Sequence, residues 1–284
     1  ITALIGVILL ISIITAGYMI FIHKEDEGIT SIAVLPFVDD SPGKDQDYFC
    51  EGIAEEIRNT LMIIPNLKVI GRQSCSMFKG KNVSSYEIGR ELGVESILEG
   101  SLGKEGDNLR IFAKLIKVSD QSQLFSLAYN EKTSETINIK EEIAHSIVNK
   151  LRIKVAENEQ ATFEKRYTNN VEAWSLYQLG RFYWNKRNEE SLLNGIEYFE
   201  QVIDIDPTYA LAYTGIADCY NLLGNSGYKP PREAYSKAKI ATEKALDLDD
   251  MLAEAHASLG HIKHFFEWDF PGSEKEFKRA REIN

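Results

Sequence analysis

The sequence has few cysteines, which limits the redox and metal chemistry that it can carry. The three are Cys50, Cys75 and Cys219, which lie far apart, and no pair has the CxxC spacing. This arrangement gives no support to a zinc ribbon or to a thioredoxin-like site. We therefore expect three buried free thiols, in a chain whose 284 residues suggest about two domains.

Basic residues are also scarce relative to acidic ones. The chain has 32 lysines and arginines against 43 aspartates and glutamates, which gives a formal net charge of −11 at pH 7. A protein that binds nucleic acid needs a basic face to neutralise phosphate groups. Nucleic acid is therefore not an expected partner of this chain.

Charged side chains are absent from residues 1–22, ITALIGVILLISIITAGYMIFI. A helix of this length spans roughly 33 Å, and the core of a bilayer is about 30 Å thick. The run predicts a transmembrane helix over residues 1–22, in contact with the lipid bilayer, and a juxtamembrane linker over 23–30. A buried helix of a globular domain is the alternative. Because the chain begins without a methionine, we also expect an upstream part.

A glycine-rich phosphate loop is missing where a nucleotide site would be expected. The stretch Ser31–Ile57 predicts a strand, a loop and a helix, a junction at which enzymes often hold phosphates. Such a loop needs several glycines and a lysine beside the helix start. Here Gly43 is the one glycine, and Gly43-Lys44 is followed by Asp45. The acidic loop repels anions and lacks the spacing of a calcium loop, so we expect a solvated turn without cofactor or metal.

Residues 31–155 carry the patterns of an α/β domain. Apolar residues alternate from Leu109 to Leu115, which is the period of a half-buried strand. Apolar residues four positions apart, from Ile139 to Leu151, indicate a closing helix. These patterns predict a sheet that is covered by helices.

Five motifs in this region resemble the TolB-like amino-terminal (FlgO-type) domain. They are IAVLPF, DYFCEGIAEEIRNTL, VIGRQSCSMFKGK, IGRELGV and ILEGSLGKEGDNLRI, in this order. That domain is found in many bacterial multidomain membrane and signalling proteins. The resemblance implies an accessory domain that is not an enzyme and has no catalytic residues. The chain departs from the family at Phe125, where a tryptophan is common.

The flank of the apolar run bears on the side of the membrane. One lysine, Lys24, precedes three acidic residues, and a single lysine is a weak cytoplasmic anchor. Together with the family resemblance, this favours a single-pass inner-membrane protein of a bacterium. Its C-terminal part is then expected in the periplasm.

The last part of the chain repeats itself. The segments IEYFEQVIDIDP, KIATEKALDLDD and SEKEFKRAREIN are similar, and each follows a matching helix. The small residue of that first helix is Gly180, Ala217 or Gly260, which gives periods of 37 and 43 residues. This pattern resembles the tetratricopeptide repeat, whose period is nominally about 34 residues. We predict a linker over 156–170 and an all-α solenoid of about three repeats over 171–284, with more repeats to follow.

Two sets of residues follow from this resemblance. Small and aromatic residues pack helix against helix; these are Gly180, Tyr183, Phe199, Pro207, Ala217, Tyr220, Ala245, Gly260, Phe277 and Ala280. Polar residues on the first helices are expected to line a groove for a protein or an extended peptide; these are Gln178, Arg181, Asp218, Asn221, His261 and His264. The histidines lack the partners of a metal site.

The sequence thus predicts a membrane-tethered, non-enzymatic interaction or sensory module. It would form the C-terminal part of a bacterial signalling or transcription-regulatory protein whose output domain lies upstream. Two alternatives stay open. The chain could belong to a nucleotide cyclase or Ser/Thr kinase polypeptide, or it could be an enzyme that uses the acidic loop after Phe37.

Overall fold

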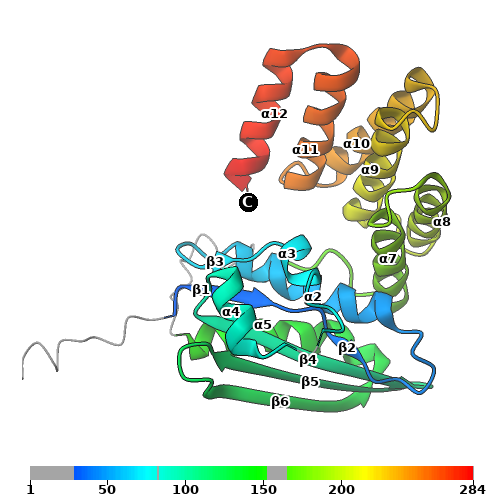
Figure 1. Cartoon of the computed structure of the whole chain (residues 1–284). Helices are drawn as coiled ribbons and strands as arrows, with labels where there is room; N and C mark the ends of the chain where they lie inside the picture. The colour runs from blue at the N-terminus through cyan, green and yellow to red at the C-terminus, as the bar shows by residue number, and fades with distance from the viewer. Residues whose placement is uncertain (1–28, 82, 152–164, 284) are drawn as a thin grey trace, which may run out of the picture.

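The computed structural model describes residues 29–81, 83–151 and 165–283 (Figure 1). The first part, up to residue 151, is a sheet with helices on both faces. Its strands are β1 (Ser31–Val34), β2 (Val38–Asp39), β3 (Lys68–Val69), β4 (Ser96–Glu105), β5 (Asn108–Lys117) and β6 (Gln123–Lys132). The strand order is β3-β1-β4-β5-β6, and β2 pairs with β4 beyond the end of β1. Pairing is parallel between β1 and its two neighbours and antiparallel from β4 to β6.

Strand β1 is buried on both faces, which explains its continuous apolar run. Ile32 and Val34 pack toward α2 (Asp47–Met62) and α5 (Thr136–Lys150). Ala33 packs on the opposite face with residues of α3 (Arg72–Ser76) and α4 (Ser85–Leu92). A strand between two helical layers reads as an apolar run because alternate side chains face opposite layers. The predicted α/β architecture of this part is confirmed.

The second part consists of helical hairpins stacked side by side (Figure 1). The helices are α7 (Val171–Trp184), α8 (Glu189–Ile205), α9 (Ala210–Asn225), α10 (Pro231–Leu248), α11 (Ala253–Ile262) and α12 (Phe270–Ile283), with a π-helical turn at Lys263–Glu267. Each odd-numbered helix packs on the helix that follows it, and neighbouring hairpins pack on one another. Asn170 and Asn188 cap α7 and α8 by accepting backbone N–H bonds.

The predicted transmembrane helix has to be corrected. Within the described residues, no helix is both long and apolar enough to cross a membrane. The longest, α10, has 18 residues but carries lysines and glutamates along its length. The run at 1–22 on which the prediction was based lies outside the described residues. The fold class is therefore a mixed α/β part followed by a helical array, and the single-pass inner-membrane placement is withdrawn with the helix.

The three thiols behave as expected. Cys50, Cys75 and Cys219 are all free and buried. Burial is the main cause that raises the pKa of Cys50 to about 12, and nearby carboxylates such as Asp39 add to it. A thiol with so high a pKa stays protonated near neutral pH and is a poor nucleophile or metal ligand.

The loop after Phe37 differs from the expected solvated acidic turn. Asp39 is only 7% exposed, and its carboxylate accepts the backbone N–H groups of Ser41 and Gln46 at 2.8 and 2.7 Å. Burial alone would raise the pKa of Asp39, but these hydrogen bonds hold the pKa below its usual value. Asp39 therefore orders the turn that leads into α2, whereas its neighbour Asp40 is exposed.

We expect Asp39→Asn to lower the free energy of unfolding at pH 7 by about 1 kcal/mol, because an amide has one oxygen where the carboxylate has two acceptors. The folded-state pKa of Asp39 lies below its unfolded value of about 4. Its contribution is therefore complete above that value and lost as pH falls through the folded pKa. Urea titrations should show the difference between wild type and variant shrinking below about pH 4. Asp40→Asn is the control, and an equal loss there would contradict the assignment.

Candidate functional site

The two parts of the chain meet where α2 crosses α7. Trp174 of α7 belongs to the hydrophobic core of the α/β part, and its ring lies edge-on to Phe49 with centroids 5.2 Å apart. At Gly52, an added Cβ would lie 2.6 Å from Cγ of Gln178, so only glycine allows this approach. The helical array is therefore packed against the α/β part and not merely linked to it.

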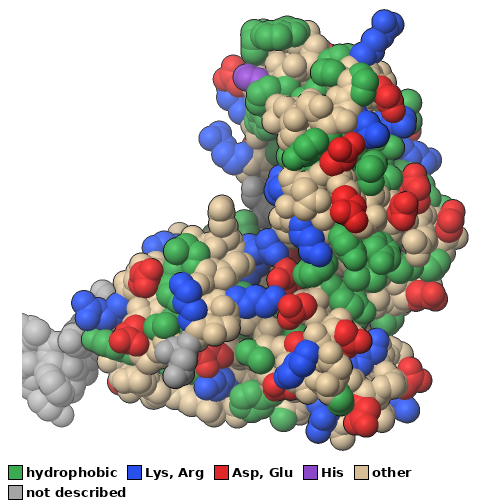
Figure 2. All heavy atoms as spheres, turned by 45° about the vertical axis from the view of Figure 1, so that its right-hand side comes forward, with side chains coloured by type: hydrophobic (Ala, Val, Ile, Leu, Met, Phe, Trp, Pro, Cys, Tyr) green, Lys and Arg blue, Asp and Glu red, His purple; other side chains and the backbone are tan. Residues whose placement is uncertain are grey.

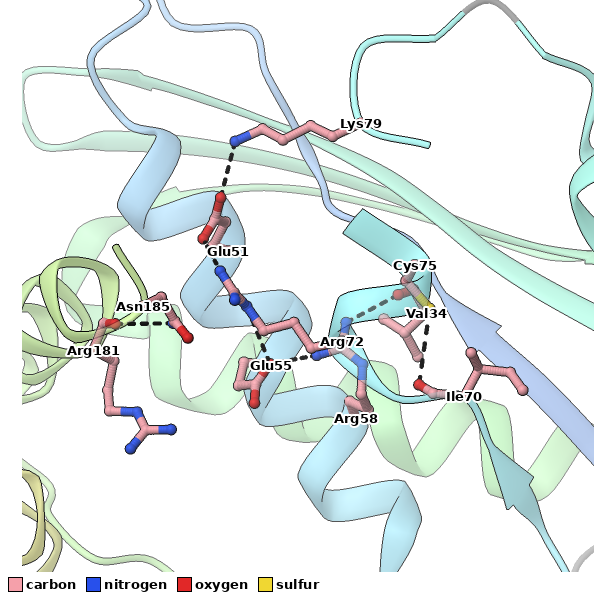
Figure 3. A network of polar contacts seen from close by, with 10 residues as sticks. All are labelled: Val34, Glu51, Glu55, Arg58, Ile70, Arg72, Cys75, Lys79, Arg181 and Asn185. Carbon is pink, nitrogen blue, oxygen red and sulfur yellow. Dashed lines mark hydrogen bonds and ion pairs between the residues drawn. The ribbon is translucent and has the colours of Figure 1, made fainter. Parts of the chain in front are cut away.

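Ion pairs along α2 extend this junction toward α3 (Figure 3). The Arg72 guanidinium pairs with Glu51 at 2.5 Å, and Lys79 pairs with the same carboxylate at 3.0 Å. Arg58 is buried, pairs with Glu55 and donates to the carbonyl oxygen of Val34 at the end of β1. Figure 2 shows side chains of both signs gathered where the two parts meet. Each of these cations is paired with a carboxylate of α2, so they do not form a free basic patch.

A cavity of about 180 Å³ lies between the two parts. Residues of α2 and α5 line one side, and residues of α7 and the first turns of α9 and α11 line the other. Ile283 at the end of α12 also reaches it, in agreement with the return of α12 toward the α/β part in Figure 1. Pockets for drug-sized ligands are typically about 300–1,000 Å³. This cleft is therefore sized for one side chain of a partner.

Two buried tyrosines form the aromatic floor of the cleft. Tyr177 and Tyr209 are 7% and 1% exposed, and their ring centroids lie 5.1 Å apart. Neither hydroxyl is among the buried side-chain atoms of the described residues that lack a hydrogen-bond partner. Burial raises the pKa of both hydroxyls, so both remain neutral near pH 7 and keep a proton to donate.

The charges of the cleft are paired with one exception. Lys140 pairs with Glu56 at 2.8 Å, and Arg181 pairs with Asp218 at 3.5 Å. Glu254, in the first turn of α11, has no ion pair with any cation of the described residues. Glu254 is an exposed residue, although partial desolvation in the cleft raises the pKa of its carboxyl more than the positive charge of Arg181 lowers it. Burial likewise raises the pKa of Asp218 more than Arg181 lowers it.

The six predicted groove residues are divided between the cleft and the interior of the array. Gln178 and Arg181 line the cleft, and Gln178 is buried with its amide 3.4 Å from Glu56. Asp218 does not line the cleft, but it pairs with Arg181, which does. Asn221 is buried and donates to the carbonyl oxygen of Ser258, which ties α9 to α11. Gln178 and Asn221 are thus packing residues rather than exposed ones.

The two histidines lie away from the cleft. His261 stacks between Tyr235 and Phe265, and burial lowers the pKa of its imidazole. His264 is exposed and contacts the rings of Phe265 and Phe270. Neither has the surroundings of a metal ligand, and no group of three metal-binding side chains occurs in the described parts of the chain. A role of the histidines in partner binding stays a prediction.

Most of the predicted packing residues are buried or half-buried among the helices, whereas Pro207 and Phe277 are exposed. An added Cβ at Gly180 would lie 2.5 Å from the Phe199 ring, and one at Gly260 would lie 2.9 Å from the Phe277 ring. An added Cβ at Gly215 would also lie 2.5 Å from the Phe199 ring, a close approach that the sequence pattern had not indicated. Others of the set are buried (Ala217, Ala245) or half-buried (Tyr183, Tyr220, Ala280).

The hollow beside the acidic loop offers less for chemistry. It is lined by Phe37, Asp39 and several lysines. Lys79 pairs with Asp47 at 3.2 Å and Lys114 with Glu99 at 2.9 Å. Since Asp39 is engaged by backbone N–H groups, its carboxylate is already used in shaping the loop.

Comparison with known proteins places these features in context. A scan against models of protein families finds no match. A curated protein of Rhizobium meliloti (strain 1021), named putative adenylate cyclase 3, is 33% identical over 187 residues. The match covers 66% of this chain and 32% of the relative, so the chain spans about a third of that relative's length. The expectation that the chain is not an enzyme is corrected by this finding, because the relative is named as an enzyme.

Similar solved structures include three proteins of bacteria. TolB from Acinetobacter baumannii has a TM-score of 0.33 at 15% identity, over 43% of this chain and 28% of its own. The LpoB C-terminal domain from Salmonella enterica has 0.31 at 15%, over 38% and 87%. Lipoprotein GNA1162 from Neisseria meningitidis has 0.31 at 15%, over 45% and 99%. TolB and LpoB are thus among the solved structures with some similarity to this chain, and the tetratricopeptide assignment is not confirmed.

Proposed function

We propose that the described residues form a binding module for a protein or peptide segment within a longer signalling polypeptide. The cleft between α2 and the helical array is the binding site. The observation that supports this most is the cavity of about 180 Å³ between the two parts, where charged groups of both signs surround Tyr177 and Tyr209. A side chain of a partner would enter this cavity. The repeated hairpins, which we assign to the tetratricopeptide type, provide the rigid wall of the cleft.

An extended segment suits this cleft better than a cofactor or a nucleic acid. The cavity admits one side chain, so the rest of a partner must lie along the surface around it. That surface carries charged groups of both signs, and such groups hold a peptide by side-chain hydrogen bonds. The formal net charge of −11 disfavours a polyphosphate chain as the partner.

We expect Ala253→Trp to abolish binding of peptides selected against the wild-type chain from a random library. Ala253 lines the cleft at the start of α11, and an indole there would fill the cavity. Calorimetry should show a loss of at least about tenfold in affinity, which corresponds to about 1.4 kcal/mol. The matched control is Glu243→Trp, which adds the same ring on the exposed side of α10. If both variants bind as wild type does, the selected peptides dock outside the cleft and the proposal fails.

Nucleotide cyclisation is a second candidate function, favoured by the name of the Rhizobium meliloti relative. Because the chain spans about a third of that protein, the activity would be that of the longer polypeptide. Incubating the chain with ATP and Mg²⁺ or Mn²⁺, and measuring cyclic AMP against heat-inactivated protein, tests whether this segment is sufficient. Product above that background would make the chain itself an enzyme.

A further inference from the structure

We propose that the hollow beside the acidic loop binds a small apolar molecule that carries one carboxylate, an aliphatic or aromatic monocarboxylic acid. The apolar part of this ligand would lie on Phe112, and its carboxylate would pair with Lys81; both residues line the hollow. No residue lines both the hollow and the cleft between the two parts, so this site is separate from that of the proposed function.

The hollow forms because the helical layer on this face of the sheet is short. The helices α3 and α4 have 5 and 8 residues, whereas the strands β4, β5 and β6 have 10 residues each. Alternate side chains of β5, such as Leu109 and Ile111, face the opposite layer of α2 and α5. Phe112 therefore faces the side of α3 and α4, where the two helices leave part of the sheet open.

A row of side chains crosses this open part of the sheet. Val38 of β2 pairs with Ser101 of β4. Ser101 and Ala128 of β6 lie on either side of Phe112 in β5. Paired residues share a face of the sheet, and both neighbours of Phe112 are small. The Phe112 ring is therefore 40% exposed and Val38 is 58% exposed, which gives the hollow an apolar floor that is open to a ligand.

The wall of the hollow continues a buried core. Leu35, Phe78 and Ile88 belong to the hydrophobic cluster beneath α3 and α4, and all three also line the hollow. Val83 packs against the same cluster at the rim. The hollow has a volume of about 650 Å³, within the range of about 300–1,000 Å³ that is typical of pockets for small molecules. An apolar group placed there would extend this core over Phe112 and leave water.

The carboxylates that line the hollow already have partners. Asp39 accepts two backbone N–H groups. Asp47 pairs with Lys79 at 3.2 Å, and Glu99 pairs with Lys114 at 2.9 Å. A cationic ligand would therefore have to displace a lysine before it could reach a carboxylate.

One lysine of the hollow lacks such a partner. Lys44 faces Asp40 at 3.7 Å, but Lys81 has no ion pair with any carboxylate in the parts of the chain that the structure describes. The turn at Gly80, whose φ is 71°, precedes Lys81, and Nζ of Lys81 lies 5.9 Å from the centroid of the Phe78 ring. A carboxylate beside this wall would accept a charge-assisted hydrogen bond from Lys81.

The test is an NMR titration of the whole chain with small probes that separate charge from apolar area. Octanoate and 4-phenylbutyrate are the acids, 4-phenylbutanamide is a neutral molecule of the same shape, and 4-phenylbutylamine is a cation. We expect saturable shifts at residues of the hollow with both acids, and affinity for 4-phenylbutyrate about tenfold above that for the amide. No saturable shift with either acid, equal affinity for acid and amide, or tighter binding of the amine would each overturn the inference.

Two variants at exposed positions divide the site into its charged and apolar parts. Lys81→Gln should weaken 4-phenylbutyrate about tenfold and leave the amide unchanged, whereas Lys244→Gln, on the exposed side of α10, is the matched control. Phe112→Ala should weaken the acid and the amide alike, because both lose the floor. Its control is Phe265→Ala, since Phe265 is 48% exposed and lies in the helical array. Wild-type affinity for 4-phenylbutyrate in Lys81→Gln or in Phe112→Ala would overturn the inference.

The two proposals fail separately. Ala253→Trp fills the cleft and should leave the affinity for 4-phenylbutyrate unchanged, because Ala253 does not line the hollow. If Ala253→Trp instead abolishes binding of the acid, the acid occupies the cleft and the inference is overturned. The proposed function is tested by the library peptides alone, whatever the acids do.

Discussion

Replacing Trp174 by alanine should lower the free energy of unfolding by about 3–5 kcal/mol, the usual cost of removing a large buried aromatic side chain. Trp174 is 2% exposed and lies in the core of the α/β part, although it belongs to the first helix of the array. The alanine variant also loses the edge-on contact between Trp174 and Phe49. The loss is therefore shared by both parts of the chain, because one side chain joins them.

Scanning calorimetry and limited proteolysis would measure this effect. Wild type should unfold in one transition, whereas Trp174→Ala should unfold in two, because the junction of α2 and α7 loses its central contact. The matched control is Trp268→Ala, since Trp268 is 72% exposed and should change stability by about 0.5 kcal/mol or less. If the two variants are equally stable, or if Trp174→Ala still unfolds in one transition, the two parts are not held together by Trp174.

Local patterns were sufficient to predict the elements, because the period of the apolar residues marks the buried face of each helix or strand. The alternation from Leu109 to Leu115 became β5, and the apolar spacing from Ile139 became α5. Buried thiols were predictable because three widely spaced cysteines leave few other roles. The repeated segments likewise became hairpins, since the same apolar spacing recurs in each.

The cleft could not be predicted, because its residues come from elements far apart in the chain. Tyr177 could have been noticed, since it lies four residues before Arg181 on the same face of α7. Nothing near Glu254 in the sequence indicates that α2 faces it, and that approach depends on Gly52 meeting Gln178. The assumption that polar groups on first helices are exposed led to Gln178 and Asn221, which the fold uses as internal hydrogen-bonding groups.

The hairpin array itself should fail when Gly180 is enlarged. An added Cβ at Gly180 would lie 2.5 Å from the ring of Phe199, and an added Cβ at Gly215 in α9 would lie equally close to the same ring. The ring therefore cannot move away without meeting α9. We expect Gly180→Leu to cost about 3 kcal/mol or more, at the upper end of what overpacking a core usually costs.

Urea unfolding of Gly180→Leu, with hydrogen exchange to locate the damage, would check this expectation. Exchange should rise in α7, α8 and α9 and stay low in β4 and β5, because Phe199 contacts only the array. The matched control is Gly71→Leu, since the space around Gly71 is open and its φ is −62°, which suits any residue. Adding Phe199→Ala to Gly180→Leu should recover part of the loss, because the two substitutions occupy the same space. If Gly71→Leu lowers the free energy of unfolding as much as Gly180→Leu does, the effect is not due to the Phe199 ring. If Phe199→Ala destabilises the Gly180→Leu variant as much as it destabilises wild type, then Phe199 does not fill the space above Gly180.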